Sequence, residues 1–158
     1  MGKLLISFRN MNIYCYKSNE LPEAAWEVLK ISPVAVLSTV SRDGKPMSAV
    51  VYYYYDDQGN LYFLTKTDSR KFVNFQNTPQ ISAIIMNSEN MRTLEIEGYV
   101  EVNMDSGDLV EAIKKIVERT KLTNHEGWLP VLQTEGVNLA LIKITPDRWC
   151  WTAFDKPE

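Results

Sequence analysis

Apolar and polar residues alternate with a period of two over much of the chain, and this pattern predicts β-strands. The clearest alternation runs over residues 93–102, where small or apolar residues on one face are separated by mainly polar residues on the other. The same kind of pattern predicts six further strands, at 34–40, 47–55, 61–64, 81–86, 137–144 and 148–154. Pro146 separates the last two, because proline cannot donate to a strand ladder.

Helix signals are fewer and occupy three segments. Pro22 suits the first turn of an amphipathic helix over 23–30, and Asp68 or Ser69 can cap a short helix over 70–75. Apolar residues at helical spacing over 109–117 predict the one long helix. About seven strands and few helices favour a mainly β fold, a small closed or partly closed antiparallel barrel with helices packed outside it.

The length of 158 residues fits a single domain spanning 1–158. Within it, residues 1–18 are expected to be an N-terminal extension or an edge strand, because Arg9 and Asn10 interrupt their apolar run before it reaches signal-peptide length. No stretch approaches a membrane span, so a cytoplasmic location is expected.

The 17 basic and 20 acidic residues are interspersed, which argues against a nucleic-acid or anionic-membrane surface. Cys15 and Cys150 have no neighbours at metal-ligand spacing, so no metal site is expected and both are interpreted as ordinary reduced thiols.

The expected strand 47–55 departs from alternation at its end. Residues 50–55 are two valines followed by four tyrosines, a run that is apolar or aromatic on both faces and needs a cover on its outer side. A second protomer or a flat aromatic ligand would provide this cover, since tyrosine rings pack well at interfaces. Packing of the protein's own helices on the run is the alternative.

A candidate anion site lies where the strand 61–64 runs into the short helix. Three hydroxyls and two positive charges fall within seven residues there: Thr65, Thr67, Ser69, Arg70 and Lys71. Free N–H groups and the helix dipole favour an anion at a helix N-terminus, and arginine and lysine add charge. The pattern suits a phosphate, although such residues at a helix start are commonly just a solvated surface.

The order of these segments resembles the pyridoxamine-phosphate-oxidase-like, FMN-binding split barrels. The resemblance covers about 21–151 and is most specific in Thr65-Lys-Thr-Asp-Ser-Arg-Lys71, with supporting matches at Val36-Leu-Ser-Thr39, Gly44-Lys-Pro46, Asn77-Thr-Pro79 and Gly98. It implies a six- to seven-stranded antiparallel split β-barrel that holds FMN at a homodimer interface. FAD or a deazaflavin is the less favoured cofactor, because a deazaflavin calls for more basic residues.

The resemblance also implies roles for individual residues. Arg70 and Lys71 match the ligands of the FMN phosphate, with Thr65 and Ser69 near the same end of the cofactor. The strand that borders the flavin ring is matched by Ser48, Ala49, Val50 and Val51. The two residues that approach the ring from elsewhere are matched by Thr93 and Trp151. No catalytic residue is assigned.

The sequence departs from true pyridoxamine phosphate oxidases. Their C-terminal Arg-x-His substrate motif is replaced by Arg148-Trp-Cys150, so oxidation of vitamin B6 is not expected. His125 is the only histidine and is more simply an exposed loop residue than a general acid or haem ligand. Two hypotheses remain: an FMN-dependent oxidoreductase acting on an unknown small molecule, and a non-catalytic or stress-response module that binds flavin, haem or deazaflavin.

Overall fold

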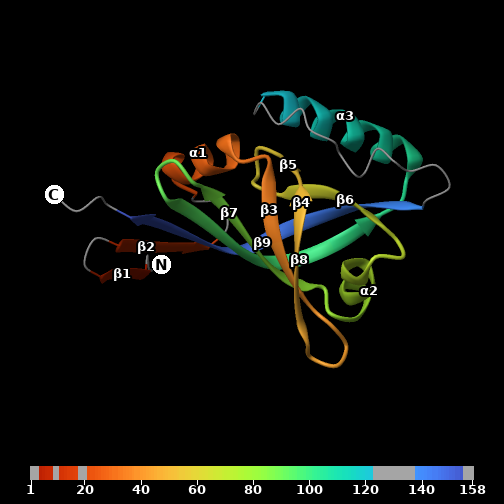
Figure 1. The fold of residues 1–158 in the computed structure, drawn as a ribbon, viewed down its shortest axis with the longest axis horizontal. Helices are drawn as coiled ribbons and strands as arrows, with labels where there is room; N and C mark the ends of the chain where they lie inside the picture. Colours follow the sequence, from red (N-terminus) through yellow and green to blue (C-terminus); the bar gives the residue numbers. More distant parts are fainter. Residues whose placement is uncertain (1–3, 9–10, 18–20, 123–137, 155–158) are drawn as a thin grey trace.

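The computed structural model describes residues 4–8, 11–17, 21–122 and 138–154 (Figure 1). Within these residues the chain forms three helices, which are α1 (Glu23–Ile31), α2 (Arg70–Asn77) and α3 (Ser106–Leu122). The same residues form nine strands: β1 (Leu4–Phe8), β2 (Met11–Lys17), β3 (Val34–Val40), β4 (Pro46–Tyr52), β5 (Tyr54–Tyr55), β6 (Leu61–Lys66), β7 (Gln80–Asn87), β8 (Arg92–Asn103) and β9 (Leu139–Phe154).

All strand pairs are antiparallel and belong to one curled sheet in the order β1-β2-β9-β8-β7-β3-β4. The long strand β9 pairs with β8 along one side, while its other side pairs first with β6 and then with β2. Strands β4 and β6 approach each other without forming a ladder in the described part of the chain, so the barrel is open there. The expected mainly β, antiparallel split barrel with peripheral helices is confirmed.

The expected break at Pro146 is absent, because β9 is one continuous strand of 16 residues. Opposite it, Gly98 pairs with Pro146 while Glu97 pairs with Arg148, so Asp147 is an extra residue in a bulge. A side chain at Gly98 would lie 2.3 Å from the carbonyl oxygen of Thr145, which explains the glycine. The bulge accommodates the proline, and the prediction of two separate strands was wrong.

The protein's own helices pack on the tyrosine rings at 53 and 54. Tyr53 is buried and donates a hydrogen bond to the carbonyl of Leu29 in α1, at 3.1 Å. Tyr54 stacks on Tyr62 at 4.8 Å, and both pack against α3. The alternative, cover by the protein's own helices, is therefore what the structure shows for Tyr53 and Tyr54, through α1 and α3, while Val50 of the same run stays exposed.

The outer face of β3, β4 and β7 remains open instead. Val36 lies between Val50 and Ile84 in the register of the three strands, so the three side chains form one row across the sheet. All three are exposed, and Val50 is 65% exposed. Apolar side chains that gather on a flat sheet face favour contact with another apolar surface.

The two cysteines are joined by a disulfide, so the interpretation of separate reduced thiols was wrong. Strand β2 pairs with β9, and Cys15 lies directly opposite Cys150 in that ladder. The two cysteines are 135 residues apart in the sequence, so no rule based on cysteine spacing predicts the disulfide. In Figure 1, β1 and β2 form a hairpin at the edge of the sheet, far from α3. None of the helices in the described segments is long and apolar enough to cross a membrane.

Candidate functional site

The junction of β6 and α2 forms a compact, hydroxyl-lined corner. Thr65 is buried, and its hydroxyl lies 2.9 Å from that of Ser69. The Ser69 oxygen also accepts a hydrogen bond from the backbone N–H of Phe72, at 3.3 Å, and so caps α2. The helix is fixed against β3 by Asn74, whose buried amide donates to the hydroxyl of Thr39. The start of α2 is thereby held in place.

A cavity of about 210 Å³ opens beside this corner. It brings together five of the residues expected at a cofactor site, namely Val50, Val51, Thr65, Ser69 and Lys71. Apolar residues form most of the remaining wall. The cavity therefore has an apolar side along β4 and a polar, cationic side at the start of α2.

Lys71 is the half-buried cation of this cavity. Burial lowers the pKa of its ammonium group, because removal from water penalises the charged form. No carboxylate of the described residues pairs with it, and no other side chain hydrogen-bonds to it there. A partly desolvated cation without an anionic partner is stabilised when an anion binds next to it.

Backbone groups add to the binding capacity on both sides. The N–H groups of Arg70 and Lys71 are in the first turn of α2, where no helical carbonyl precedes them. Among the strands that the structure describes, β4 pairs only with β3, so its other edge offers N–H and C=O groups without a ladder partner among these strands, near Val50 and Val51. An anion suits the first set, and a planar ligand that hydrogen-bonds through its edge suits the second.

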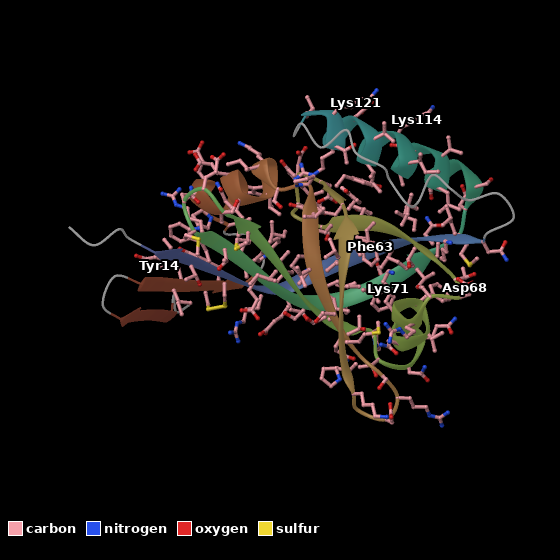
Figure 2. All side chains as sticks on the ribbon, in the orientation of Figure 1. Tyr14, Phe63, Asp68, Lys71, Lys114 and Lys121 are labelled. Atoms are coloured by element: carbon pink, nitrogen blue, oxygen red, sulfur yellow. A yellow bond between two sulfur atoms is a disulfide. The ribbon has the colours of Figure 1, made fainter. Side chains whose placement is uncertain are left out.

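Arg70 does not share this cavity with its neighbour. It is exposed and lines a separate hollow with Asp68, Val73 and residues of the β3–β4 turn. Figure 2 shows Asp68 and Lys71 on the α2 side of the molecule. Successive helical residues point about 100° apart, which explains why two adjacent basic residues face different hollows.

The other expected residues lie around or away from the cavity. Ser48 and Ala49 precede its wall along β4, and Thr67 is in the turn after β6, where its N–H donates to the carbonyl of Asn138. Thr93 and Trp151 lie on β8 and β9, where Trp151 stacks on Tyr14. Figure 2 places Tyr14 and Lys71 well apart along the molecule. One chain alone does not bring Thr93 and Trp151 to the cavity.

Five lining residues were not among the expected cofactor-binding residues: Tyr52, Leu64, Lys66, Ile116 and Leu139. Lys66 lies inside the expected Thr65–Lys71 segment and could have been included on charge alone. Ile116 on α3 and Leu139 at the start of β9 are distant in sequence. The packing of α3 over β6 brings Ile116 here, and the pairing of β9 with β6 brings Leu139 opposite Lys66. His125 lies outside the described residues. Among the residues described, no group of three acidic, histidine or cysteine side chains could hold a metal.

Several solved structures share this fold. An F420 reductase matches with a TM-score of 0.68 and 23% identity, over 82% of this chain and 98% of that one. The haem storage protein HutZ from Vibrio cholerae matches with a TM-score of 0.59 and 16% identity, over 80% and 89% of the two chains. A pyridoxamine 5'-phosphate oxidase-related, FMN-binding protein from Nostoc punctiforme matches with a TM-score of 0.55 and 16% identity, over 78% and 79%.

These identities are low, so the three likenesses establish the fold alone. A search of curated proteins found no match to this chain. A family model is more specific, because it scores the sequence position by position. The model described as pyridoxamine 5'-phosphate oxidase matches residues 21–150, which include β3 to β8, most of β9 and the whole corner between β6 and α2. The protein therefore belongs to the pyridoxamine 5'-phosphate oxidase family.

Proposed function

We propose that the protein binds FMN in the cavity between β4 and α2 and uses it as a flavin-dependent oxidoreductase on a small molecule. The observation that carries this proposal is Lys71, a half-buried cation without an anionic partner among the described residues, at the start of a helix. A phosphate at this point would regain the electrostatic energy that burial of the lysine costs.

The residues present fit FMN at both ends of the cavity. The phosphate would be held by the Lys71 ammonium group, the Ser69 and Thr65 hydroxyls and the open N–H groups of α2. The flavin ring would lie along the unpaired edge of β4, with its polar edge toward the backbone of 48–51. When bound, FMN supplies the capacity to accept and donate two electrons, while the chain binds and orients it and excludes water.

The size of the cavity supports a site shared between two copies of the chain. Its volume of about 210 Å³ is below the range of roughly 300–1,000 Å³ usual for ligand pockets. The exposed row of Val36, Val50 and Ile84 borders it through Val50 and offers an apolar surface for a second protomer. In such a homodimer the partner would supply the missing wall, and Thr93 and Trp151 are the proposed contributors.

A second candidate is a binding module for haem or a deazaflavin. The F420 reductase and the haem storage protein among the structural neighbours suggest these two ligands. The cavity favours FMN over F420, because Lys66 and Lys71 are its only basic lining residues in the described segments and a deazaflavin has additional acidic groups. For haem, no histidine lies among the described residues, since His125 is outside them.

The first experiment is an absorbance spectrum of the purified protein before and after addition of FMN, with gel filtration to remove free ligand. A flavin band that co-elutes with the protein at dimer size supports the proposal. Reduction of that flavin by a reduced nicotinamide under anaerobic conditions would separate an oxidoreductase from a storage module. Exclusive uptake of haem or F420 would favour the second candidate and contradict the first.

The dimer has its own test. Val50→Asp places a charge in the centre of the proposed interface and should weaken association by roughly tenfold or more. Val110→Asp is the matched control, because Val110 is exposed to a similar degree, at 52%, on helix α3. Dissociation of the control, or a V50D protein that remains dimeric, would place the interface elsewhere.

A further inference from the structure

The N-terminal hairpin is attached to the sheet along one strand only. Strand β2 pairs with β1 and with β9, and within the described residues β1 pairs with nothing else. The family match begins at residue 21, so the hairpin lies outside it. A two-stranded ribbon is marginally stable in water, and its attachment to β9 therefore decides whether it stays folded.

The disulfide is the covalent part of this attachment. Cys15 and Cys150 are opposite each other in the ladder between β2 and β9, with Cα atoms 4.1 Å apart. The bond is visible in Figure 2 as the yellow link beside the hairpin. The non-covalent part includes the ladder itself and the Tyr14 ring, which stacks on Trp151 with centroids 5.3 Å apart.

A guanidinium group lies against both sulfur atoms. The Arg148 Nε atom is 3.3 Å from the Cys150 sulfur, and its Nη2 atom is 4.0 Å from the Cys15 sulfur. Glu97, 3.6 Å from Arg148 Nη1, orients the guanidinium and also offsets part of its charge. A cation at this distance favours the thiolate over the thiol, and the thiolate is the species that forms and breaks disulfides.

We propose that Cys15 and Cys150 form a redox-active pair that locks the hairpin onto β9 when oxidised and releases it when reduced. The reductant is a low-molecular-weight thiol of the glutathione class. Its thiolate attacks one sulfur, the cysteine–cysteine bond breaks, and a mixed disulfide forms. A second reductant thiol resolves it, so two electrons and two protons reach the cysteines and two reductant thiols become one disulfide.

Release has a defined structural consequence. The segment 148–154 of β9 loses its neighbour β2 and becomes an exposed sheet edge, and Trp151 loses the tyrosine that covers it. Cys15 is only partly buried, so a small thiol can reach the bond. In a reducing compartment such as the expected cytoplasm, protein disulfides are usually transient, which suits a pair that opens and closes.

The proposal is tested by hydrogen exchange at a series of ratios of reduced to oxidised glutathione, with thiol alkylation and mass spectrometry on the same samples. We expect a reversible two-electron transition in which both cysteines become alkylated together. Across it, backbone exchange in residues 11–17 should accelerate at least tenfold, while strand β7 stays unchanged as an internal control. Equal exchange in the two states would overturn the proposal.

Two variants complete the test. The double variant Cys15→Ser/Cys150→Ser should show the fast exchange of the reduced protein at every glutathione ratio, and its circular dichroism spectrum checks that the barrel is folded. Arg148→Gln should slow alkylation of the reduced cysteines several-fold at neutral pH. Cysteines that are alkylated freely in the native protein under oxidising conditions would also exclude the locked state.

Discussion

Two half-buried cations occupy contrasting positions in this protein. Arg119 on α3 donates to the carbonyls of Leu29 and Ser32, the latter at 2.7 Å, and lies over the ring of Tyr53 at 4.7 Å. Lys71 on α2 has no such partners among the described residues and faces a cavity. The first charge is satisfied by the carbonyls at the end of α1 and by tyrosine rings, whereas the second remains open to a ligand.

This difference separates a structural charge from a binding charge. A buried cation that donates to several acceptors fixes the elements around it, here α1, α3 and β5. A partly desolvated cation without acceptors lowers the stability of the fold. Groups of this kind cluster at functional sites, where ligand binding or catalysis benefits from the charge. Substitution of Arg119 should therefore lower mainly the stability of the fold, whereas substitution of Lys71 should lower mainly the affinity for a ligand.

Arg119→Ala is expected to have the largest effect. It removes the hydrogen bonds to two carbonyls and the contacts with Tyr53 and Tyr55, so the free energy of unfolding should fall by about 2–4 kcal/mol. Denaturant unfolding measures this change. Lys121→Ala is the matched control, because Lys121 points away from the barrel on the same helix (Figure 2) and should change stability by less than about 0.5 kcal/mol. Equal losses in the two variants would contradict the structural role of Arg119.

Lys71→Ala should lower ligand affinity without lowering stability. Loss of a charge-assisted hydrogen bond to phosphate should weaken FMN binding by roughly ten- to a hundredfold, or about 1.5–3 kcal/mol. Riboflavin, which lacks the phosphate, should bind both proteins with nearly the same affinity. Fluorescence titration with the two ligands measures both effects. An unchanged FMN affinity would remove the phosphate assignment, and an equal loss for riboflavin would move Lys71 to the ring.

The pH dependence of FMN binding sharpens the same assignment. Because burial lowers the pKa of Lys71 below its ordinary 10.5, the ammonium charge is lost at a lower pH than that of an exposed lysine. FMN affinity should therefore decline on the alkaline side before pH reaches that ordinary value, and Lys71→Met should flatten the decline.

In the ligand-free protein, the free energy of unfolding should rise with pH over the same alkaline range in which FMN affinity declines. The unfolded chain holds the Lys71 proton up to the ordinary pKa, while the folded chain releases it earlier. The unfolded state then binds more protons between the two values, so stability rises with pH in that window. Urea unfolding at several pH values measures the rise, and its persistence in Lys71→Met would assign it to another group.

Arg70→Ala is expected to have the smallest effect on binding, less than about threefold, because Arg70 lines a different hollow from Lys71. A loss as large as that of Lys71→Ala would show that the exposed guanidinium turns toward the phosphate when FMN binds. The pair of variants thus tests whether the two adjacent basic residues act together, as the family resemblance implies, or separately.

Much of the fold could be predicted because the alternation of β3 and β8 and the capping signal at Ser69 are local. The pairing of Cys15 with Cys150 and the cover of Tyr54 by α3 could not, since both depend on contacts between distant segments. The anion site was predictable as a segment but not residue by residue. Its division between Lys71 and Arg70 depends on the rotation of α2 relative to the barrel, which no sequence pattern specifies.

The single bulged residue Asp147 determines which face of β9 each later side chain occupies. Before it, even-numbered residues such as Ile142 and Ile144 point into the barrel; after it, the inward positions are odd, as at Trp149. If Asp147 instead took a regular place in the ladder, the parity would not shift, and Trp149 would turn out to solvent and Arg148 inward. The bulge at Asp147 thus reverses the alternation of inward and outward side chains along β9, and Cys150 faces outward, opposite Cys15 of the hairpin, because of this reversal.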